Sequence, residues 1–118
     1  MSEPPLLDRT VIEDLRETIG ADGVRSVIEV FIEESDNYLA RIAAGAGDPA
    51  ALDRARRAAH SLKSGAGQIG ALAVAAAAAA VEQAAGSNTG DFAKTAAVLQ
   101  RRTTDTIAAL RALIAAPD

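Results

Sequence analysis

Apolar residues recur along this chain at intervals of three and four positions, which is the spacing of one face of an α-helix. The pattern continues through five segments, and no stretch alternates apolar and polar residues as a half-buried strand would. Aspartates stand where four of the helices should begin, because a short acidic side chain caps a helix N-terminus well. The pattern therefore predicts an all-α protein. The expected capping residues are Asp8, Asp22, Asp48 and Asp91.

The lengths of the five segments predict their arrangement. The first, about residues 8–19, is short and is expected to pack across one end of the fold, before Gly20 ends it. The other four, over about residues 22–116, are long enough for an antiparallel four-helix bundle with short loops. We expect residues 1–118 to form a single domain of this kind. The other expected helix ends are Gly45 with Gly47, Gly67 with Gly70, Gly86 before a turn at residues 86–90, and Pro117.

The third segment has the clearest core stripe. It begins at Asp48-Pro49, an N-cap followed by a first-turn proline. Its apolar positions alternate between spacings of three and four residues, as in the seam of a helix bundle. These positions are Leu52, Ala55, Ala59, Leu62, Ala66 and Ile69. The predicted stripes of the first, second and fifth segments are, in turn, Val11, Ile12, Leu15 and Ile19; Val24, Val27, Ile28, Phe31, Tyr38, Leu39 and Ile42; and Phe92, Ala96, Leu99, Thr103, Ile107, Leu110 and Ile114.

Alanine dominates the apolar residues, so the helices must pack closely, because each alanine buries little surface. The alanine-rich stretch 71–85 is too short to span a bilayer and includes Glu82, so we expect a buried helix and no membrane contact. The formal net charge of −4 disfavours nucleic acid as a partner. The chain has no cysteine and starts without the features of a signal peptide, so a cytoplasmic protein is expected.

The candidate chemistry reduces to one residue. A single histidine without cysteine cannot form a usual zinc site, so no metal site is expected. The glycines near Lys63 do not match a phosphate-binding loop, and Ser61 and Ser64 have no recognisable general base. What remains is His60, which lies about 100° around the helix from the core position Ala59 and should face solvent.

The neighbours of His60 suit phosphoryl chemistry. A neutral imidazole is a competent nucleophile near neutral pH, and a nearby cation such as Lys63 favours that neutral form and would offset the charge of a phosphoryl group. Ser64 can donate a hydrogen bond, and small residues beside the ring leave room for another protein's active site. A lone exposed histidine can equally be inert, and the glycines can simply mark a helix end. The residues expected to serve docking and access are Arg56, Arg57, Ser64, Gly65 and Gly67.

The segment AHSLKSGAGQIGA, residues 59–71, resembles the signature of the histidine phosphotransfer (Hpt) domain family. That signature reads histidine, any residue, Leu, Lys, small residues, Asn or Gln, an apolar residue and Gly. Ser64 and Gly65 depart from the family's usual Gly and Ser or Ala, but both stay small. Glu82 falls where the family often has an acidic residue, and the helix order also matches, so the resemblance covers nearly the whole chain. The matching positions are His60, Leu62, Lys63, Gln68 and Gly70.

The resemblance implies a phosphoryl carrier and not an enzyme. His60 would take a phosphoryl group from an aspartyl phosphate on a receiver domain and pass it to a second receiver. Lys63 would hold the phosphoryl charge, and Gln68 would orient the imidazole. Magnesium and the catalytic carboxylates would belong to the receiver, so no cofactor is expected on this chain. The implied partners are response-regulator receivers and a hybrid histidine kinase. We expect the chain itself to be a monomer.

Two other functions stay open. The chain could be a docking module that binds and inhibits a receiver or a histidine kinase without carrying phosphate, although the presence of both His60 and Lys63 argues against this. It could also be an alanine-rich bundle with a structural role. That third function needs only the core pattern and leaves the residues around His60 unexplained.

Overall fold

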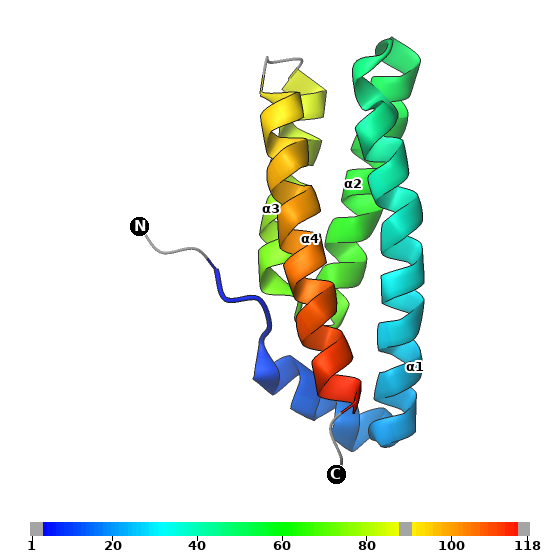
Figure 1. The fold of residues 1–118 in the computed structure, drawn as a ribbon, viewed down its shortest axis with the longest axis vertical. Coiled ribbons are helices and arrows are strands. Elements are labelled where there is room, and N and C mark those ends of the chain that lie inside the picture. The colour runs from blue at the N-terminus through cyan, green and yellow to red at the C-terminus, as the bar shows by residue number, and fades with distance from the viewer. Residues whose placement is uncertain (1–3, 88–90, 116–118) are drawn as a thin grey trace.

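Four α-helices and one short 3₁₀-helix make up the part of the chain that the computed structural model describes, residues 4–87 and 91–115. They are α1 (Arg9–Ala43), η1 (Ala44–Ala46), α2 (Pro49–Gln68), α3 (Leu72–Ser87) and α4 (Phe92–Ala115). The long part of α1 packs against α2, α2 against α3 and α3 against α4, each antiparallel to the next (Figure 1). These described residues contain no strand. The prediction of an all-α, antiparallel four-helix bundle is confirmed.

A kink at Gly20 divides α1 into the two segments that the sequence predicts. Gly20 has φ 78° and ψ 170°, a conformation outside the helical region that glycine adopts without a steric penalty. The section before the kink lies across the end of the bundle (Figure 1). Asp8 caps this section as predicted, since its side chain accepts a hydrogen bond from the Thr10 backbone N–H at 3.0 Å. Asp22 lies in the first turn after the kink and not at an N-cap, because Gly20 is the only non-helical residue inside α1.

The two other predicted capping aspartates stand at the starts of α2 and α4. The Asp48 side chain accepts a hydrogen bond from the backbone N–H of Ala51 at 2.8 Å, and Pro49 occupies the first turn. The backbone carbonyl of Asp91 accepts the Thr95 N–H at 2.9 Å, so Asp91 immediately precedes the first turn of α4. These starts agree with the sequence prediction.

The predicted break of α2 at Gly67 is wrong, because the helix continues through this residue to Gln68. A glycine costs only about 1 kcal/mol inside a helix, and Ala66 and Ile69, which flank the end of α2, are both buried. The chain turns instead at Gly70, where φ is 75°. A Cβ added there would lie 2.9 Å from the Asp8 carbonyl oxygen and from Val11 Cβ. The Asp8 backbone N–H donates to the Gly70 carbonyl at 2.7 Å, which fastens the N-terminal segment to the α2–α3 turn.

The remaining predicted helix ends are close to the observed ones. α1 ends at Ala43 and passes through η1 before α2 begins, so the prediction of an end at Gly45 and Gly47 is nearly correct. α3 runs to Ser87, one residue beyond the predicted Gly86. Residues 88–90 of the predicted turn and the predicted end at Pro117 lie outside the described residues.

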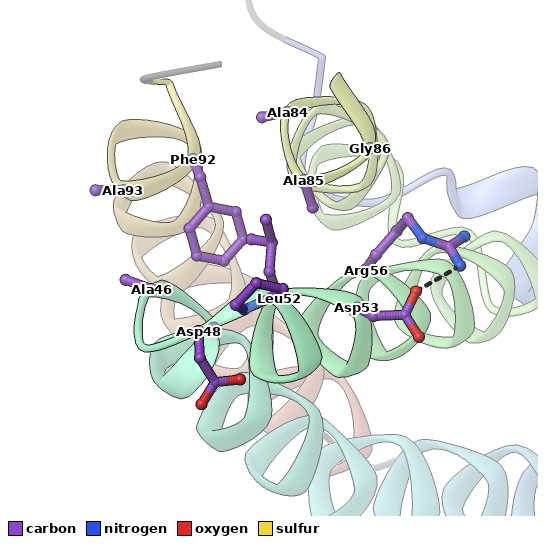
Figure 2. Close-up of a pocket in the computed structure, with 12 residues that line it drawn as sticks. Ala46, Asp48, Leu52, Asp53, Arg56, Ala84, Ala85, Gly86, Phe92 and Ala93 are labelled. Atoms are coloured by element: carbon purple, nitrogen blue, oxygen red, sulfur yellow. Dashed lines mark hydrogen bonds and ion pairs between the residues drawn. The ribbon is translucent and has the colours of Figure 1, made fainter. Parts of the chain in front are cut away.

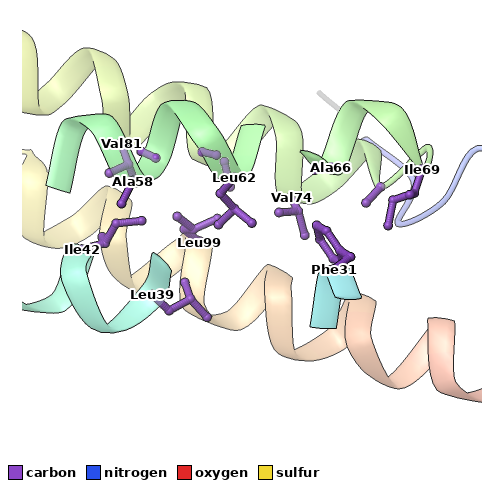
Figure 3. Packing of buried hydrophobic residues seen from close by; sticks show 14 of the residues in the cluster. Phe31, Leu39, Ile42, Ala58, Leu62, Ala66, Ile69, Val74, Val81 and Leu99 are labelled. Carbon is purple, nitrogen blue, oxygen red and sulfur yellow. The ribbon is translucent and has the colours of Figure 1, made fainter. Parts of the chain in front are cut away.

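The core lies between all four α-helices. Figure 3 shows Phe31 of α1, Leu62 of α2, Val74 of α3 and Leu99 of α4 converging on it. α2 and α3 share the most extensive contact, which alanines make possible because their side chains let two backbones approach closely. Fully buried alanines of these two helices include Ala55, Ala59, Ala66 and Ala78. The predicted stripe of α2 is therefore confirmed, with Leu52 half-buried at its end.

Two predicted core positions are wrong, since Ile19 is 42% exposed and Val27 is 37% exposed. Both lie on α1, where the helical spacing alone does not show how far the neighbouring helix covers the apolar stripe. Thr103 of α4 is buried as predicted, and Thr106, which the sequence pattern did not single out, is also fully buried. Neither threonine hydroxyl has a hydrogen-bond partner in the part of the chain that the structure describes.

Candidate functional site

His60 projects from the middle of α2 toward solvent, with 62% of its side chain exposed. The neighbouring residue Ala59 is fully buried, so the ring lies at the edge of the core stripe, as the helical spacing predicts. Its Nδ1 atom lies 2.7 Å from Oε2 of Glu82 on α3. The histidine is thus held from one side by the adjacent helix and open on the other.

Glu82 also binds the lysine one turn along α2. Lys63 Nζ donates to Glu82 Oε1 at 2.7 Å, so one carboxylate bridges His60 and Lys63. The Glu82 side chain is only 23% exposed, and that of Lys63 is 37% exposed. The ammonium group of Lys63 is therefore paired with Glu82, and the charged group that contacts the ring is a carboxylate. The predicted role of Lys63 in holding the phosphoryl charge stays a prediction.

The charge state of Glu82 decides which nitrogen of His60 carries the proton. The hydrogen bond from Lys63 lowers the pKa of Glu82 below its ordinary value, against the opposing effect of burial, and the contact with His60 lowers it further. Glu82 is therefore ionised at neutral pH, and an ionised carboxylate can only accept hydrogen bonds. The proton of the neutral ring must then sit on Nδ1, which leaves the lone pair on Nε2. This arrangement presents a nucleophilic nitrogen.

The two predicted docking arginines lie on the turn before His60 and share one partner. Arg56 Nη2 and Arg57 Nη2 each lie 3.0 Å from a carboxylate oxygen of Asp53 (Figure 2 shows the Arg56 pair). The hydrogen bond from Arg56 is the main cause that lowers the pKa of Asp53, opposed by desolvation and helped by Arg57. The pairs join residues three and four positions apart on one exposed helix face, so they order the arginine side chains without burying them.

The small residues predicted to give access follow His60 on α2. Ser64 and Gly67 are exposed, and nothing lies within 4 Å of a Cβ added at Gly67. Gly65 is half-buried, and a Cβ there would lie 3.9 Å from Cδ1 of Phe31. The surface of α2 just beyond the histidine therefore carries only small side chains or none, so a partner can approach the ring closely.

Gln68 lies eight residues beyond His60, about 12 Å along the helix axis. It is exposed at the last residue of α2. The imidazole Nδ1 is bonded to Glu82, and the predicted orienting role of Gln68 stays a prediction.

A shallow apolar groove lies between α1 and α2, and Gly65 and Gln68 form part of its α2 wall. Its volume is about 270 Å³, and Val27 and Val30 at its edge are 37% and 53% exposed. Its lining is Ser26, Val27, Val30, Phe31, Glu34, Gly65, Gln68 and Ile69. The sequence pattern missed Val30, because that residue falls outside the helical core stripe and only its exposure beside the groove draws attention to it.

A larger hollow of about 590 Å³ opens at the other end of α2. Figure 2 shows Phe92 of α4 on its wall, together with Leu52 and Arg56 of α2. Ala84, Ala85 and Gly86 of α3 also line it. Its lining is mostly apolar and small, and none of the residues in contact with the imidazole belongs to it.

Glu82 is the residue whose role the sequence alone did not reveal. The resemblance marked it as an acidic position, but its contacts with His60 and Lys63 join residues 22 and 19 positions apart in the chain. Only the register between α2 and α3 brings them together. In the residues that the structure describes, no three His, Asp or Glu side chains are placed to hold a metal ion.

The comparison with known proteins agrees with this arrangement. The Hpt domain family matches residues 26–116. The structure of histidine-containing phosphotransfer protein B (HptB) from Pseudomonas aeruginosa PAO1 is similar, with a TM-score of 0.83 and 24% sequence identity over 95% of this chain and 96% of that chain. A rice protein described as a histidine-containing phosphotransfer protein is similar with a TM-score of 0.71 and 23% identity, over 94% of this chain and 85% of the other. No curated protein matches the chain.

The described chain is an antiparallel helical bundle with an exposed histidine on α2. The family match covers most of the sequence, and this chain belongs to the Hpt domain family. Members of this family carry phosphoryl groups rather than catalyse a reaction of their own, and their partners are response-regulator receivers. The two structural likenesses show the shared fold. No helix in the described part of the chain is long and apolar enough to cross a membrane.

Proposed function

We propose that this chain is a phosphorelay intermediate in which Nε2 of His60 accepts a phosphoryl group from a receiver aspartate and passes it to a second receiver. The observation that carries the proposal is the 2.7 Å contact between His60 Nδ1 and the Glu82 carboxylate. That contact occupies the nitrogen nearer the backbone and leaves the exposed one free. The alternative of an inert surface histidine gives no reason for an ordered partner on the adjacent helix.

In the transfer step, the imidazole is the only group of this chain that forms a bond to phosphorus. The Nε2 lone pair attacks the phosphorus of the aspartyl phosphate, the N–P bond forms as the P–O bond breaks, and the receiver's carboxylate leaves with the electron pair. The phosphorylated ring still holds its Nδ1 proton and so carries a positive charge. The Glu82 carboxylate stabilises that charge, and the charged ring is a good leaving group for the return transfer. Magnesium and the carboxylates that bind it belong to the receiver.

Lys63 supports this step by its position one turn from His60. Its ammonium group donates to Glu82 at 2.7 Å and has three protons, so it can bond the carboxylate and a phosphoryl oxygen together. Lys63 thus offsets part of the charge that the phosphoryl group brings. Replacing it with alanine should slow transfer while leaving His60 as the acceptor.

The apolar groove between α1 and α2 is the surface on which we place the receiver. Its lining includes Gly65, one of the small residues that follow His60 on α2. The exposed Val27 and Val30 give the groove apolar area that a partner can bury. Apolar contact of this kind favours binding to many receivers, whereas charges at the rim select among them. The partners we expect include the receiver of a hybrid histidine kinase, and the chain is expected to act as a monomer.

The direct test is a phosphotransfer profile with phosphorylated receivers from the same host. Wild type should gain an acid-labile, base-stable phosphate, and His60→Gln should gain none while keeping its helical circular dichroism spectrum. Receivers that bind wild type and His60→Ala equally, without any transfer to wild type, would instead indicate a docking module. A receiver panel that never labels the wild type overturns the proposal.

A further inference from the structure

A second concave surface lies next to His60 on the side of α2 that faces α1. Its volume is about 180 Å³, and three of the five residues that line it are arginines. They come from the last turn of α1 and the first half of α2. We call it the arginine cleft, and its lining is Arg41, Arg54, Arg57, Ala58 and Ser61. Nothing in the phosphoryl chemistry of His60 requires it.

The positive charge of the arginine cleft is only partly balanced. Arg57 shares the Asp53 carboxylate with Arg56, so a single anion serves two arginines. Neither Arg41 nor Arg54 forms an ion pair with any residue in ranges 4–87 and 91–115, and both are exposed. The chain as a whole has a net charge of −4. A basic surface on an acidic protein is thus concentrated beside the histidine.

The position of the cleft relative to His60 follows from helical geometry. Ser61 is the next residue in the chain, and Arg57 is one turn before the histidine. Arg54 is six residues away, about 9 Å along the helix axis. A stable protein interface covers about 800 Å² on each partner, so a receiver that reaches the ring also covers the cleft. Glu82 and Lys63 lie on the other side of the ring, toward α3.

We propose that the arginine cleft binds an acidic surface of the partner receiver and selects receivers by charge. This inference rests on the proposed function, because the receiver is placed over His60. Arg41 and Arg54 provide unpaired guanidinium groups that a carboxylate pair can bind with two hydrogen bonds each. The apolar groove lies on the opposite side of the ring along α2, so the two surfaces bracket the histidine. The negative net charge of the chain favours a local acidic patch over an extended polyanion such as nucleic acid.

The test compares two double charge reversals that change the net charge equally. Arg41→Glu with Arg54→Glu alters the cleft, whereas Arg101→Glu with Arg111→Glu alters exposed residues of α4. Transfer from a phosphorylated cognate receiver is followed by rapid quench at about 0.05 M and about 1 M salt, where screening lengths are roughly 14 and 3 Å. Circular dichroism and urea unfolding check the fold, and Arg41→Gln with Arg54→Gln serves as a milder variant.

We expect the cleft variant to lose about tenfold in the second-order rate constant of transfer at low salt, with the rate constant at saturating receiver unchanged and the loss removed at high salt. The α4 variant should remain within about twofold of wild type. Equal losses in both variants, or no loss in the cleft variant, overturn the inference. Phosphoramidate, a small phosphoryl donor, should label His60 alike in all variants. If no receiver labels the wild type, the proposed function itself fails. That result differs from one in which receivers label the wild type and the cleft variant equally well.

Discussion

Replacing Glu82 with glutamine should destabilise the folded chain, because a single carboxylate connects α3 to two residues of α2. The substitution keeps the size of the side chain and removes its charge. In the wild type, Lys63 Nζ and His60 Nδ1 both lie 2.7 Å from carboxylate oxygens of Glu82. Glutamine can accept one of these hydrogen bonds through its carbonyl oxygen, but it cannot bridge both groups with a charge.

The exposure of the three side chains sets the size of the effect. A shielded charge-assisted hydrogen bond contributes about 1.5–3 kcal/mol and an exposed ion pair about 0.2–1 kcal/mol. Glu82 is 23% exposed, Lys63 37% and His60 62%, so the Lys63 contact falls between these ranges and the His60 contact near the lower one. We therefore expect the free energy of unfolding at pH 7 to fall by about 1–1.5 kcal/mol.

The loss should depend on pH in one direction. The hydrogen bond from Lys63 lowers the pKa of Glu82 in the folded chain below the ordinary value of 4.5. The unfolded chain thus takes up the proton first as the pH falls. The stabilisation by Glu82 is complete above pH 4.5 and disappears as the pH falls through the lower folded-state pKa. The stabilities of wild type and Glu82→Gln should therefore converge in acid.

Urea unfolding followed by circular dichroism, repeated from pH 7 down to pH 3, measures this difference. Glu33→Gln is a matched control, because Glu33 is exposed on α1 and far from the histidine in the chain. It should change stability by less than about 0.5 kcal/mol at every pH. A Glu82→Gln variant as stable as wild type at pH 7, or a difference that persists unchanged at pH 3, would refute the reasoning.

Three further substitutions test the packing by urea unfolding. Leu62→Ala should cost about 2–5 kcal/mol, because Leu62 is 1% exposed directly beneath the helix face that bears the histidine; a loss below 1 kcal/mol would contradict the described core. Gly70→Ala should cost about 1–3 kcal/mol, since its φ is 75° and a Cβ would meet the Asp8 carbonyl; an unchanged midpoint would count against that turn. Thr103→Val should stabilise the chain by about 1 kcal/mol by removing a buried, unbonded hydroxyl, and a loss of stability would reveal a missing partner.

Local features of the sequence were enough to predict most of the helix boundaries. Asp48 followed by Pro49 specifies a helix start by itself, because capping and a fixed proline φ act within one turn. Gly20 likewise marks the kink in α1. The predicted end of α2 at Gly67 was wrong, since a glycine penalty of about 1 kcal/mol does not end a helix when buried residues flank the glycine. Whether a glycine bends the chain depends on tertiary contacts that a single sequence does not display.

The candidate site was predictable only as far as its local part. His60 and Lys63 lie one turn apart on a helix whose core stripe is clear, so their exposure and proximity follow from spacing alone. The partner of both residues, Glu82, depends on the register of α3 against α2, which the uniform alanines between them leave unspecified. Val27 was likewise predicted to lie in the core. The spacing of apolar residues along α1 does not show how far α2 covers this side chain, which is 37% exposed.

The nitrogen that carries the phosphoryl group tests the central claim most directly. Wild type with ¹⁵N-labelled histidine is phosphorylated by a receiver and kept at alkaline pH, where the N–P bond is stable. A ³¹P–¹⁵N correlation spectrum then identifies the bonded atom. Because Glu82 holds Nδ1, we expect one phosphoryl group, bonded to Nε2 of His60. A phosphoryl group on Nδ1, or on any residue other than His60, would contradict the claim.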